Sequence, residues 1–333
     1  MTRVWFNHWF STVYHLIQLM KQDEELQVYV IGTNKQQNSV IRQVCDEWYE
    51  EFESEGEQYV EDCLNFCLEH QVDVFVPRRR MTLISQYKEK FTQIGVKVLV
   101  EEYEIMRLLN DKASAYRELS KIEGLSIPEF YIVNTAEEFR RAYETLKDKY
   151  PRVCMKFVED EGGMSFRTIT EDKDRFNRLR IYQGSSMLYE DVCDILAEKE
   201  TFPDYMVMPY LEGEEISVDC LNTKDGLIAI PRVKGPARHE RVVYDQHILQ
   251  MVTDIMTRTD LQYPCNIQFK LSGGVPYLLE INTRMSGGLM MSCLAAGVNI
   301  PNIALNKLLG KQVPWTVDRA EKLVSYIEKP EIL

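Results

Sequence analysis

Short β-rich runs alternate with helical periodicity along the first hundred residues, and this alternation constrains the fold more than any other feature. The expected strands lie at 4–6, 28–32, 73–77 and 96–100, and the expected helices at 11–20, 58–69 and 82–94. Strands that alternate with helices pack as a parallel sheet whose faces the helices cover. We therefore expect a small, doubly wound α/β domain over residues 1–110.

The remainder of the chain predicts two α+β segments, over residues 111–200 and 201–333. In the first, Thr135 opens a helix with Glu138 three residues later, which is capping-box spacing. Strands are expected there at 127–133 and 153–157. The second segment has expected strands at 205–210, 215–221, 227–233, 266–270 and 277–282, and expected helices at 245–259, 288–296 and 301–309.

The charge balance excludes several classes of partner. The formal net charge is −13, and general binding to nucleic acid or to a membrane surface needs basic patches. An anionic ligand must therefore be held by a few local cations and backbone N–H groups. We expect neither a nucleic-acid nor a membrane partner.

The eight cysteines are scattered through apolar stretches without a CxxC pair, which indicates reduced, buried thiols in a cytoplasmic protein. Cys63 and Cys67 lie one helical turn apart, but no further cysteine pair accompanies them, so zinc is disfavoured. The opening MTRVWFNHWFSTVYHLIQLMK lacks a small-residue cleavage site and is too short and polar to span a bilayer. A first strand and a first helix are expected there.

The segment YLLEINTRMSGG places Glu280, Asn282 and Arg284 at alternate positions, which face one side of an extended chain. Gln268 lies on the preceding expected strand, across a hairpin turn, and would add an amide oxygen. Magnesium prefers oxygen ligands and commonly bridges protein carboxylates and phosphates. A magnesium–nucleotide site is one interpretation, and a solvated strand face with unrelated polar groups is the other.

Two turns could bind an anion. Arg284 can bind phosphate oxygens with both arms of its guanidinium, and Ser286-Gly287-Gly288 would expose N–H groups at the start of a helix. Lys156 precedes the loop EDEGGMS, whose glycines allow a phosphate to approach the backbone. The alternatives are a surface arginine before a turn and, because three acids at 159–161 begin the loop, an ordinary hairpin turn.

The stretch MVMPYLEGEEISVD predicts a strand, a kink at Pro209, a turn at Gly213 and a second strand. Backbone groups beside Pro209 could pair with the edge of a base, and Glu215 could accept from ribose hydroxyls. Taken alone, the stretch is equally typical of an ordinary hairpin, which is the simpler interpretation.

In this order, the segments resemble the ATP-grasp superfamily, in its carboxylate–amine ligase and carbamoyl-phosphate-synthetase-like branch. The resemblance covers most of the chain and includes NDKASAYREL, VCMKF, VMPYLEGEEISVD, PRVK, NIQF, LLEINTRMSGG and AAGVNIPNIALNKLLGK. It implies a pre-ATP-grasp α/β domain over 1–110, a central lid subdomain over 111–200, and a C-terminal subdomain with the metal and phosphate site over 201–333.

The resemblance also implies a role for individual residues. Those implied to contact ATP are Lys112 and Lys156, the lid-loop residues Gly162, Gly163 and Ser165, the adenine-hinge residues Met208, Tyr210 and Leu211, and the ribose-binding Glu215. Those implied to bind Mg²⁺, with Mn²⁺ as an alternative, are Gln268, Glu280 and Asn282. Arg284 corresponds to the arginine beside the transferred phosphate, and Arg232 and Lys234 correspond to basic positions that face the triphosphate and the substrate.

The implied activity is an ADP-forming ligase. A small-molecule carboxylate attacks the γ-phosphate of ATP, and an amine or another nucleophile then displaces phosphate from the acyl phosphate. Positioning and electrostatics supply most of such catalysis, so no nucleophilic side chain is needed. His239 could act as a base, although a lone loop histidine is more often solvated. A homodimer is expected by analogy with the family.

Two alternatives stay open. The first is a catalytically inactive, ATP-binding sensor or regulatory module, which the joint presence of the phosphate- and metal-binding residues disfavours. The second is a nicotinamide oxidoreductase that uses the N-terminal domain, which the absence of a GxGxxG motif disfavours. The chain also departs from the family at Glu240-Arg241-Val242-Val243, where relatives often carry Gly-Glu-Thr/Ser, and at the acids 159–161. The sequence identifies neither substrate.

Overall fold

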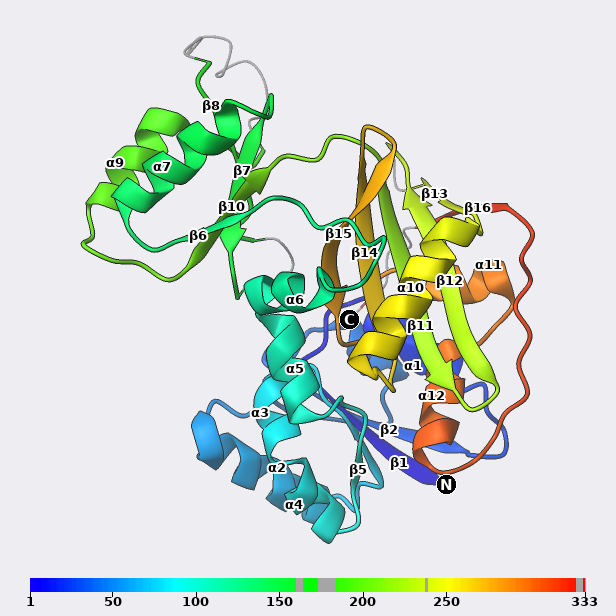
Figure 1. Ribbon diagram of the computed structural model, residues 1–333. Coiled ribbons are helices and arrows are strands. Elements are labelled where there is room, and N and C mark those ends of the chain that lie inside the picture. The colour runs from blue at the N-terminus through cyan, green and yellow to red at the C-terminus, as the bar shows by residue number, and fades with distance from the viewer. Residues whose placement is uncertain (160–163, 173–183, 237–238, 328–331, 333) are drawn as a thin grey trace. The chain divides into compact units, whose positions relative to one another are not determined.

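The computed structural model describes residues 1–159, 164–172, 184–236, 239–327 and 332 (Figure 1). The chain packs into two compact units. Unit 1 comprises Met1–Arg107, Glu214–Gln268 and Ile281–Leu333, and unit 2 comprises Leu108–Gly213 and Phe269–Glu280. The division into the segments 1–110, 111–200 and 201–333 stays a prediction.

Unit 1 begins with a five-stranded sheet in the order β3-β2-β1-β4-β5, in which all pairs are parallel. Its strands are β1 (Thr2–Asn7), β2 (Val28–Asn34), β3 (Glu47–Glu50), β4 (Val74–Val76) and β5 (Lys97–Val98). The helices between them are α1 (Val13–Met20), the 3-10 helix η1 (Val40–Val44), α2 (Gly56–Glu69), α3 (Met81–Gln86) and α4 (Lys88–Gln93). Helix α5 (Tyr103–Asn110) follows β5. The predicted doubly wound parallel sheet is confirmed.

Side-chain alternation along β1 explains why helices cover both faces of this sheet. Trp5 belongs to a core cluster with residues of α2, α3 and α4, and its ring stacks on Phe75 of β4 at a centroid distance of 4.0 Å. Val4 and Phe6 belong to the opposite cluster, which contains Leu16, Ile17 and Met20 of α1. Neighbouring residues of a strand point to opposite faces, so both faces of the sheet are apolar and need a cover.

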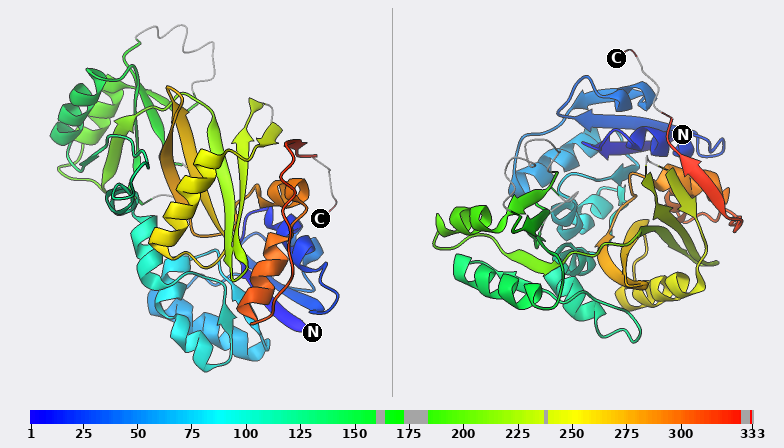
Figure 2. Two further views of the ribbon diagram at one scale, coloured as in Figure 1. Left: turned by 45° about the vertical axis from the view of Figure 1, so that its right-hand side comes forward. Right: turned by 90° about the horizontal axis from the view of Figure 1, so that it is seen from above.

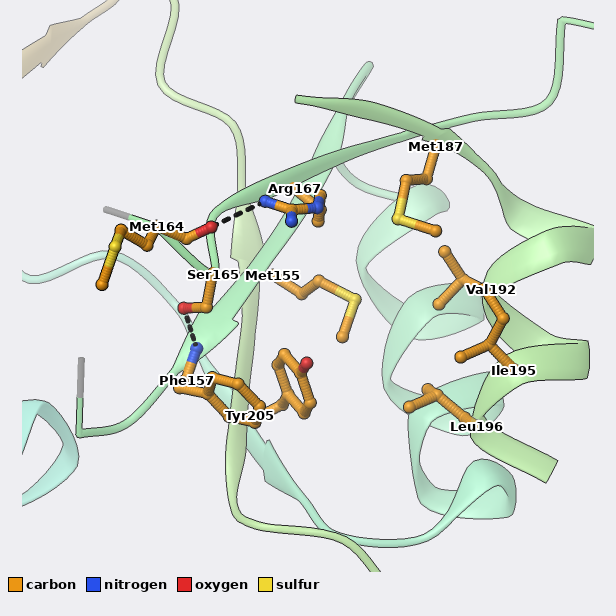
Figure 3. A pocket seen from close by; sticks show the side chains of 10 residues that line it. All are labelled: Met155, Phe157, Met164, Ser165, Arg167, Met187, Val192, Ile195, Leu196 and Tyr205. Carbon is orange, nitrogen blue, oxygen red and sulfur yellow. Dashed lines mark hydrogen bonds between the residues drawn. The ribbon is translucent and has the colours of Figure 1, made fainter. Parts of the chain in front are cut away.

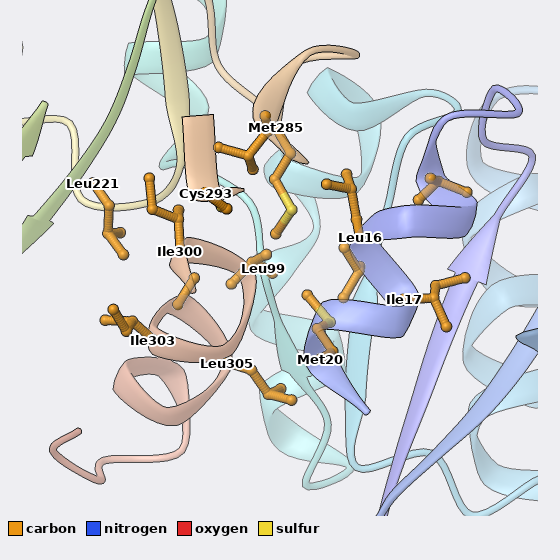
Figure 4. Packing of buried hydrophobic residues seen from close by; sticks show 14 of the residues in the cluster. Leu16, Ile17, Met20, Leu99, Leu221, Met285, Cys293, Ile300, Ile303 and Leu305 are labelled. Carbon is orange, nitrogen blue, oxygen red and sulfur yellow. The ribbon is translucent and has the colours of Figure 1, made fainter. Parts of the chain in front are cut away.

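The second cluster also joins the two ends of the chain within unit 1. Met20 of α1 lies near Leu305 of helix α12 (Ile300–Leu308) (Figure 4), and Leu16, Ile17 and Ile300 belong to the same cluster. Burying apolar surface of this kind stabilises a fold by about 25 cal/mol per Å². The C-terminal segment is therefore part of the core beneath the N-terminal sheet.

Two local expectations in this region are corrected. The helix expected over 82–94 is two helices, because the chain leaves helical geometry at Tyr87, with φ −107° and ψ 18°. Strand β3 was not expected from the sequence. Its residues, EWYE, are half-buried or exposed, so they lack the apolar pattern of an inner strand.

Unit 2 contains a mixed sheet in the order β6-β10-β7-β8-β9. Its elements are β6 (Tyr131–Val133), β7 (Val153–Phe157), β8 (Arg167–Thr170), β9 (Ser186–Leu188), β10 (Tyr205–Pro209), α6 (Lys112–Leu119), α7 (Ala136–Lys147) and α9 (Tyr189–Ala197). Apolar residues of α7 and α9 pack against this sheet (Figures 1 and 2). The Thr135 cap is confirmed: the Thr135 hydroxyl accepts from the Glu138 N–H at 3.3 Å, and the Glu138 carboxylate accepts from the N–H of Asn134, the residue before the cap, at 3.0 Å.

The third sheet has the order β15-β14-β11-β12-β13-β16. Its strands are β11 (Glu215–Thr223), β12 (Gly226–Lys234), β13 (His239–Val242), β14 (Cys265–Ser272), β15 (Val275–Asn282) and β16 (Lys322–Ser325). Helices α10 (Gln246–Thr259) and α11 (Leu289–Ala296) accompany it. The β14–β15 turn contains Gly273 and Gly274 with φ of 58° and 82°, values that favour glycine in a two-residue hairpin turn.

Within the described residues, no single helix is long and apolar enough to cross a membrane. Helices α11 and α12 meet the length and composition criteria when taken as a pair, which is bent by 101°. All eight cysteines are free thiols, and all but Cys45 are buried.

Glu101 is a buried carboxylate with a perturbed proton affinity. It is 1% exposed, and its Oε1 accepts the backbone N–H groups of Gln262 and Tyr263 at 2.9 and 2.7 Å. Burial raises the pKa of Glu101 to about 7, although these two hydrogen bonds and the charges of Lys88 and Lys307 lower it in part. The folded state therefore holds a proton that the unfolded chain releases at a lower pH.

This difference predicts a pH dependence of stability. Between the ordinary glutamate pKa of 4.5 and the folded-state pKa of about 7, the free energy of unfolding should fall as the pH rises. The Glu101→Gln variant should lack this pH dependence. Between pH 4.5 and pH 8, its unfolding free energy should therefore rise relative to that of wild type by up to about 3 kcal/mol. Urea unfolding at both pH values measures the difference. Glu102→Gln, which alters a 70% exposed carboxylate, is the control. Parallel pH profiles of Glu101→Gln and wild type would contradict the assignment.

Candidate functional site

The alternation of buried and less buried side chains along β15 shifts at the point where the predicted metal ligands lie. Leu278 and Ile281 are both buried, although they are three residues apart, and Leu279 and Glu280 between them are half-buried. A regular strand repeats every two residues, so the pattern shifts by one position, as it does at a β-bulge. Glu280 and Asn282 therefore lie on the less buried side of the strand.

Arg284 is not part of this strand. Strand β15 ends at Asn282, so the expectation that three alternate residues share one extended face is wrong for Arg284. Its guanidinium carbon instead lies 5.7 Å from the centroid of the Phe10 ring.

Gln268 lies on β14, which neighbours β15 in the sheet. Ile267 and Phe269 on either side of it are fully buried, whereas Gln268 is half-buried. Its amide nitrogen donates to Asn266 Oδ1 at 3.0 Å, which fixes the orientation of the amide group. In the described part of the chain, no three His, Cys, Asp or Glu side chains group together as metal ligands. A cation on these strands would take one carboxylate and two amide oxygens, a donor set that fits a hard ion such as Mg²⁺.

Two lysine ammonium groups are buried in unit 2. Lys112 and Lys156 are each 8% exposed. Lys112 Nζ donates to the Val158 carbonyl at 3.3 Å, and Lys156 Nζ donates to the Leu279 carbonyl at 3.4 Å. The Leu279 carbonyl also accepts from the Tyr116 hydroxyl at 2.7 Å. The β15 backbone at Leu279 therefore lies beside the positive charge of Lys156.

Tyr116 stays protonated in this setting. Burial raises the pKa of its hydroxyl, and the negative charge of Glu280 raises it further. A neutral hydroxyl can donate to the Leu279 carbonyl, so Tyr116 fixes the backbone next to Glu280.

The residues of the predicted adenine hinge lie at the end of β10. Met208 and Leu211 are buried and Tyr210 is half-buried. The Tyr210 N–H donates to the Arg152 carbonyl at 2.9 Å, and the Arg152 guanidinium lies 4.0 Å from the Tyr210 ring centroid. The hinge is therefore held by the start of β7.

Ser165 accepts from the Phe157 N–H at 2.8 Å. It also lines a largely apolar pocket of 440 Å³ in unit 2, between the sheet and α9 (Figure 3). The predicted lid residues Gly162 and Gly163 lie outside the described residues, as do residues 160 and 161 of the acidic run.

Arg232 is the centre of a buried polar network in unit 1. It is 2% exposed and forms ion pairs with Asp219, at 2.9 Å, and with Glu240. Its other hydrogen-bond partners are the hydroxyls of Ser292 (2.7 Å), Ser286 (3.3 Å) and Ser217 (3.5 Å). These contacts join β11, β12, β13 and the start of α11. The predicted role of Arg232 toward the triphosphate stays a prediction, whereas its structural role is evident.

The network continues to the predicted metal ligand on β14. Asn266 Nδ2 donates to Asp219 Oδ1 at 2.8 Å, and Asn266 Oδ1 accepts from Gln268 at 3.0 Å. The sequence analysis missed Asp219, Asn266 and Ser292. One signal was present, because each is a polar residue within an otherwise apolar run.

The remaining predicted residues are at the surface of unit 1. Lys234 forms an ion pair with Glu215, so the structure brings the predicted ribose-binding acid and a predicted substrate-facing cation together. His239 is exposed at the start of β13.

Comparison with known proteins agrees with this architecture. A family model described as "ATP-grasp in the biosynthetic pathway with Ter operon" matches residues 201–330. The carbamoyl phosphate synthase large chain of Pseudothermotoga lettingae is 22% identical over 248 residues, which cover 70% of this chain and 21% of that protein. The segment 201–330 is thus similar to ATP-grasp proteins. The chain spans about a fifth of the length of this much longer relative.

Solved structures confirm the ATP-grasp fold. The biotin carboxylase domain of the Hydrogenobacter thermophilus 2-oxoglutarate carboxylase, solved with MgADP, ADP and bicarbonate, matches with a TM-score of 0.71 and 16% identity, over 97% of this chain and 73% of that one. The N5-carboxyaminoimidazole synthetase of Staphylococcus aureus, solved with ADP, matches with a TM-score of 0.72 and 13% identity, over 98% of this chain and 82% of that one.

Removing the Arg232 guanidinium should be strongly destabilising. In Arg232→Ala, the carboxylates of Asp219 and Glu240 would stay buried without their cation, which costs about 3–5 kcal/mol. Arg241→Ala is the matched control, because Arg241 is 48% exposed and pairs with Glu214 at the surface. It should lose less than about 1 kcal/mol. Urea unfolding of both variants tests this, and equal losses would contradict the structural role of Arg232.

Proposed function

We propose that this chain is an ADP-forming, ATP-dependent ligase that joins a small-molecule carboxylate to an amine or another nucleophile. The proposal is carried by a set of oxygen donors in a chain with the ATP-grasp fold. These donors are Gln268 on β14 and Glu280 and Asn282 on β15, all of them half-buried. Solved structures of that fold contain ADP, and one of them contains MgADP, which supports ATP as the substrate.

Gln268, Glu280 and Asn282 would hold Mg²⁺, which when bound neutralises charge on the phosphates. Glu280 supplies the negative charge, and the two amides supply neutral oxygens. The hydrogen bond from Gln268 to Asn266 fixes the first amide before any ligand arrives. Ligand side chains that are oriented by a second layer of hydrogen bonds bind metals more tightly.

Lys112 and Lys156 would attract the phosphate groups of ATP. Their charges are buried, and charges act more strongly where the surroundings are less polar than water. Arg284 would stabilise the charge that develops during phosphoryl transfer, since a guanidinium can bind two phosphate oxygens at once.

The reaction has two steps in this proposal. An oxygen of the substrate carboxylate forms a bond to the γ-phosphorus, and the bond to the ADP oxygen breaks. The amine nitrogen then attacks the acyl carbon, phosphate leaves and the nitrogen loses a proton. Holding the reactants in place supplies most of the rate enhancement. A homodimer and a cytoplasmic location remain proposals from the sequence.

Replacing Glu280 with alanine should abolish metal-dependent turnover. We expect ADP release in Glu280→Ala to fall at least about 100-fold, since the change removes the charged ligand of the metal. Its unfolding free energy should stay within about 1 kcal/mol of wild type, because Glu280 is half-buried and not part of the apolar core. ADP release with pooled carboxylates and amines, with and without Mg²⁺, measures the effect.

Glu214→Ala is the control, because Glu214 is an exposed acid that pairs with Arg241. It should retain wild-type turnover. Wild-type turnover in Glu280→Ala would refute the metal assignment. ATP binding without ADP release by the wild-type protein would favour the inactive regulatory module.

A further inference from the structure

Three loops of unit 1 meet around the side chain of Phe10. Phe10 lies in the turn after β1, Arg78 follows β4, and Arg284 follows β15. The guanidinium carbons of Arg78 and Arg284 each lie 5.7 Å from the centroid of the Phe10 ring. The aromatic ring therefore holds two cations from distant parts of the sequence at one place.

This place is the edge of the parallel sheet where its strand order reverses. Strand β1 pairs with β2 on one side and with β4 on the other, and both pairs are parallel. The chain moves from β1 toward β2 and β3, and later returns to the opposite side of β1 for β4. Open α/β sheets bind ligands outside the carboxyl ends of their strands at such a reversal.

The backbone at both strand ends has an unusual conformation. His8, directly after β1, has φ of 35°, and Arg80, after β4, has φ of 56°. Side chains other than glycine rarely adopt such values, which cluster at functional sites. Buried Asn7 joins the two loops, since its Oδ1 accepts the N–H groups of Arg78 at 2.6 Å and Arg79 at 3.2 Å.

The residue before α1 adds a hydroxyl group to the same place. Thr12 precedes the helix, yet its side chain makes no capping bond, and its shielded Oγ1 has no hydrogen-bond partner among the described residues. Gly287 packs here: a Cβ at that position would lie 3.4 Å from Thr12 Oγ1 and 3.7 Å from Phe10 Cε2. The first N–H groups of α1 already donate to the carbonyls of Phe10, Ser11 and Thr12, so the Thr12 hydroxyl is the polar group left for a ligand here.

The next two residues of the loop after Arg78 are also arginines, and each lies beside a carboxylate. Arg79 lies 3.6 Å from the buried Glu51 carboxylate, and Arg80 lies 2.9 Å from Glu55. The guanidiniums of Arg78 and Arg284 both lie against the Phe10 ring. In a chain with a net charge of −13, a pair of guanidiniums at a strand-end reversal marks this edge as a place for an anion.

We propose that Arg78 binds a second anionic group, a carboxylate or a phosphate, on the non-nucleotide substrate of the ligase, and so holds the reacting carboxylate near Arg284. This inference rests on the proposed function. It narrows the substrate class to compounds with an anionic group besides the carboxylate that reacts. Arg78 is a binding residue here, and Arg284 is the residue beside the reacting phosphate.

The test is isothermal titration of the full chain with inorganic phosphate and, separately, with succinate, at low ionic strength and without ATP. Wild type should bind one of the probes, and the preferred probe shows whether the second anionic group of the substrate is a phosphate or a carboxylate. Arg78→Gln should weaken that binding at least about tenfold, since it loses a charged hydrogen-bond donor. Arg78→Lys should lie between the two, because it keeps the charge and loses the planar fork.

Arg107→Gln is the matched control, because Arg107 is an exposed arginine of unit 1 that pairs with Glu104. It should bind the probe as wild type does, and so should Glu280→Ala. Absence of probe binding by wild type, or equal affinity in wild type and both Arg78 variants, would overturn the inference. The two proposals can fail separately: turnover of Glu280→Ala tests the ligase function, and probe binding by the Arg78 variants tests the anion site.

Discussion

A buried guanidinium holds the sheet β15-β14-β11-β12-β13-β16 and the start of α11 together. Arg232 carries a full positive charge into the interior, where transfer from water costs several kcal/mol unless the charge is paired and hydrogen-bonded. Asp219 and Glu240 supply the opposite charges, and three serine hydroxyls fill the remaining directions. Because these partners come from separate strands and one helix, the pairing is satisfied only when those elements are in register.

The same network reaches the predicted metal ligand Gln268 through the side-chain amide of Asn266. Asp219 also accepts from Asn266, and Asn266 accepts from Gln268. The side chain of this predicted metal ligand is thus fixed by a chain of hydrogen bonds that begins at a core arginine. Gly288 contributes by its lack of a side chain, since a Cβ there would lie 2.7 Å from Arg232 Cζ. Local order on β14 therefore depends on packing around β12, two strands away.

Elements that are determined by local sequence patterns were predicted well. The strand at 153–157 and the helix opened by Thr135 lie where they were expected, because periodicity and capping are local properties. Strand β3 escaped prediction because an edge strand needs no apolar pattern. The burial of Arg232 was also missed, since its partners lie up to 60 residues away along the chain. The shift in β15 at Leu279 was invisible for a related reason: the groups that hold it are Tyr116 and Lys156.

Unit 1 is assembled from three stretches of chain, and its core unites the first helix with the last. Residues 1–107 expressed alone would present the apolar side of α1 without the cover that α12 provides. The N-terminal sheet is thus no module that recombination could move to another gene by itself. A split or circularly permuted version of this protein must keep both ends of the polypeptide in the same molecule, or bring two fragments together before either one folds.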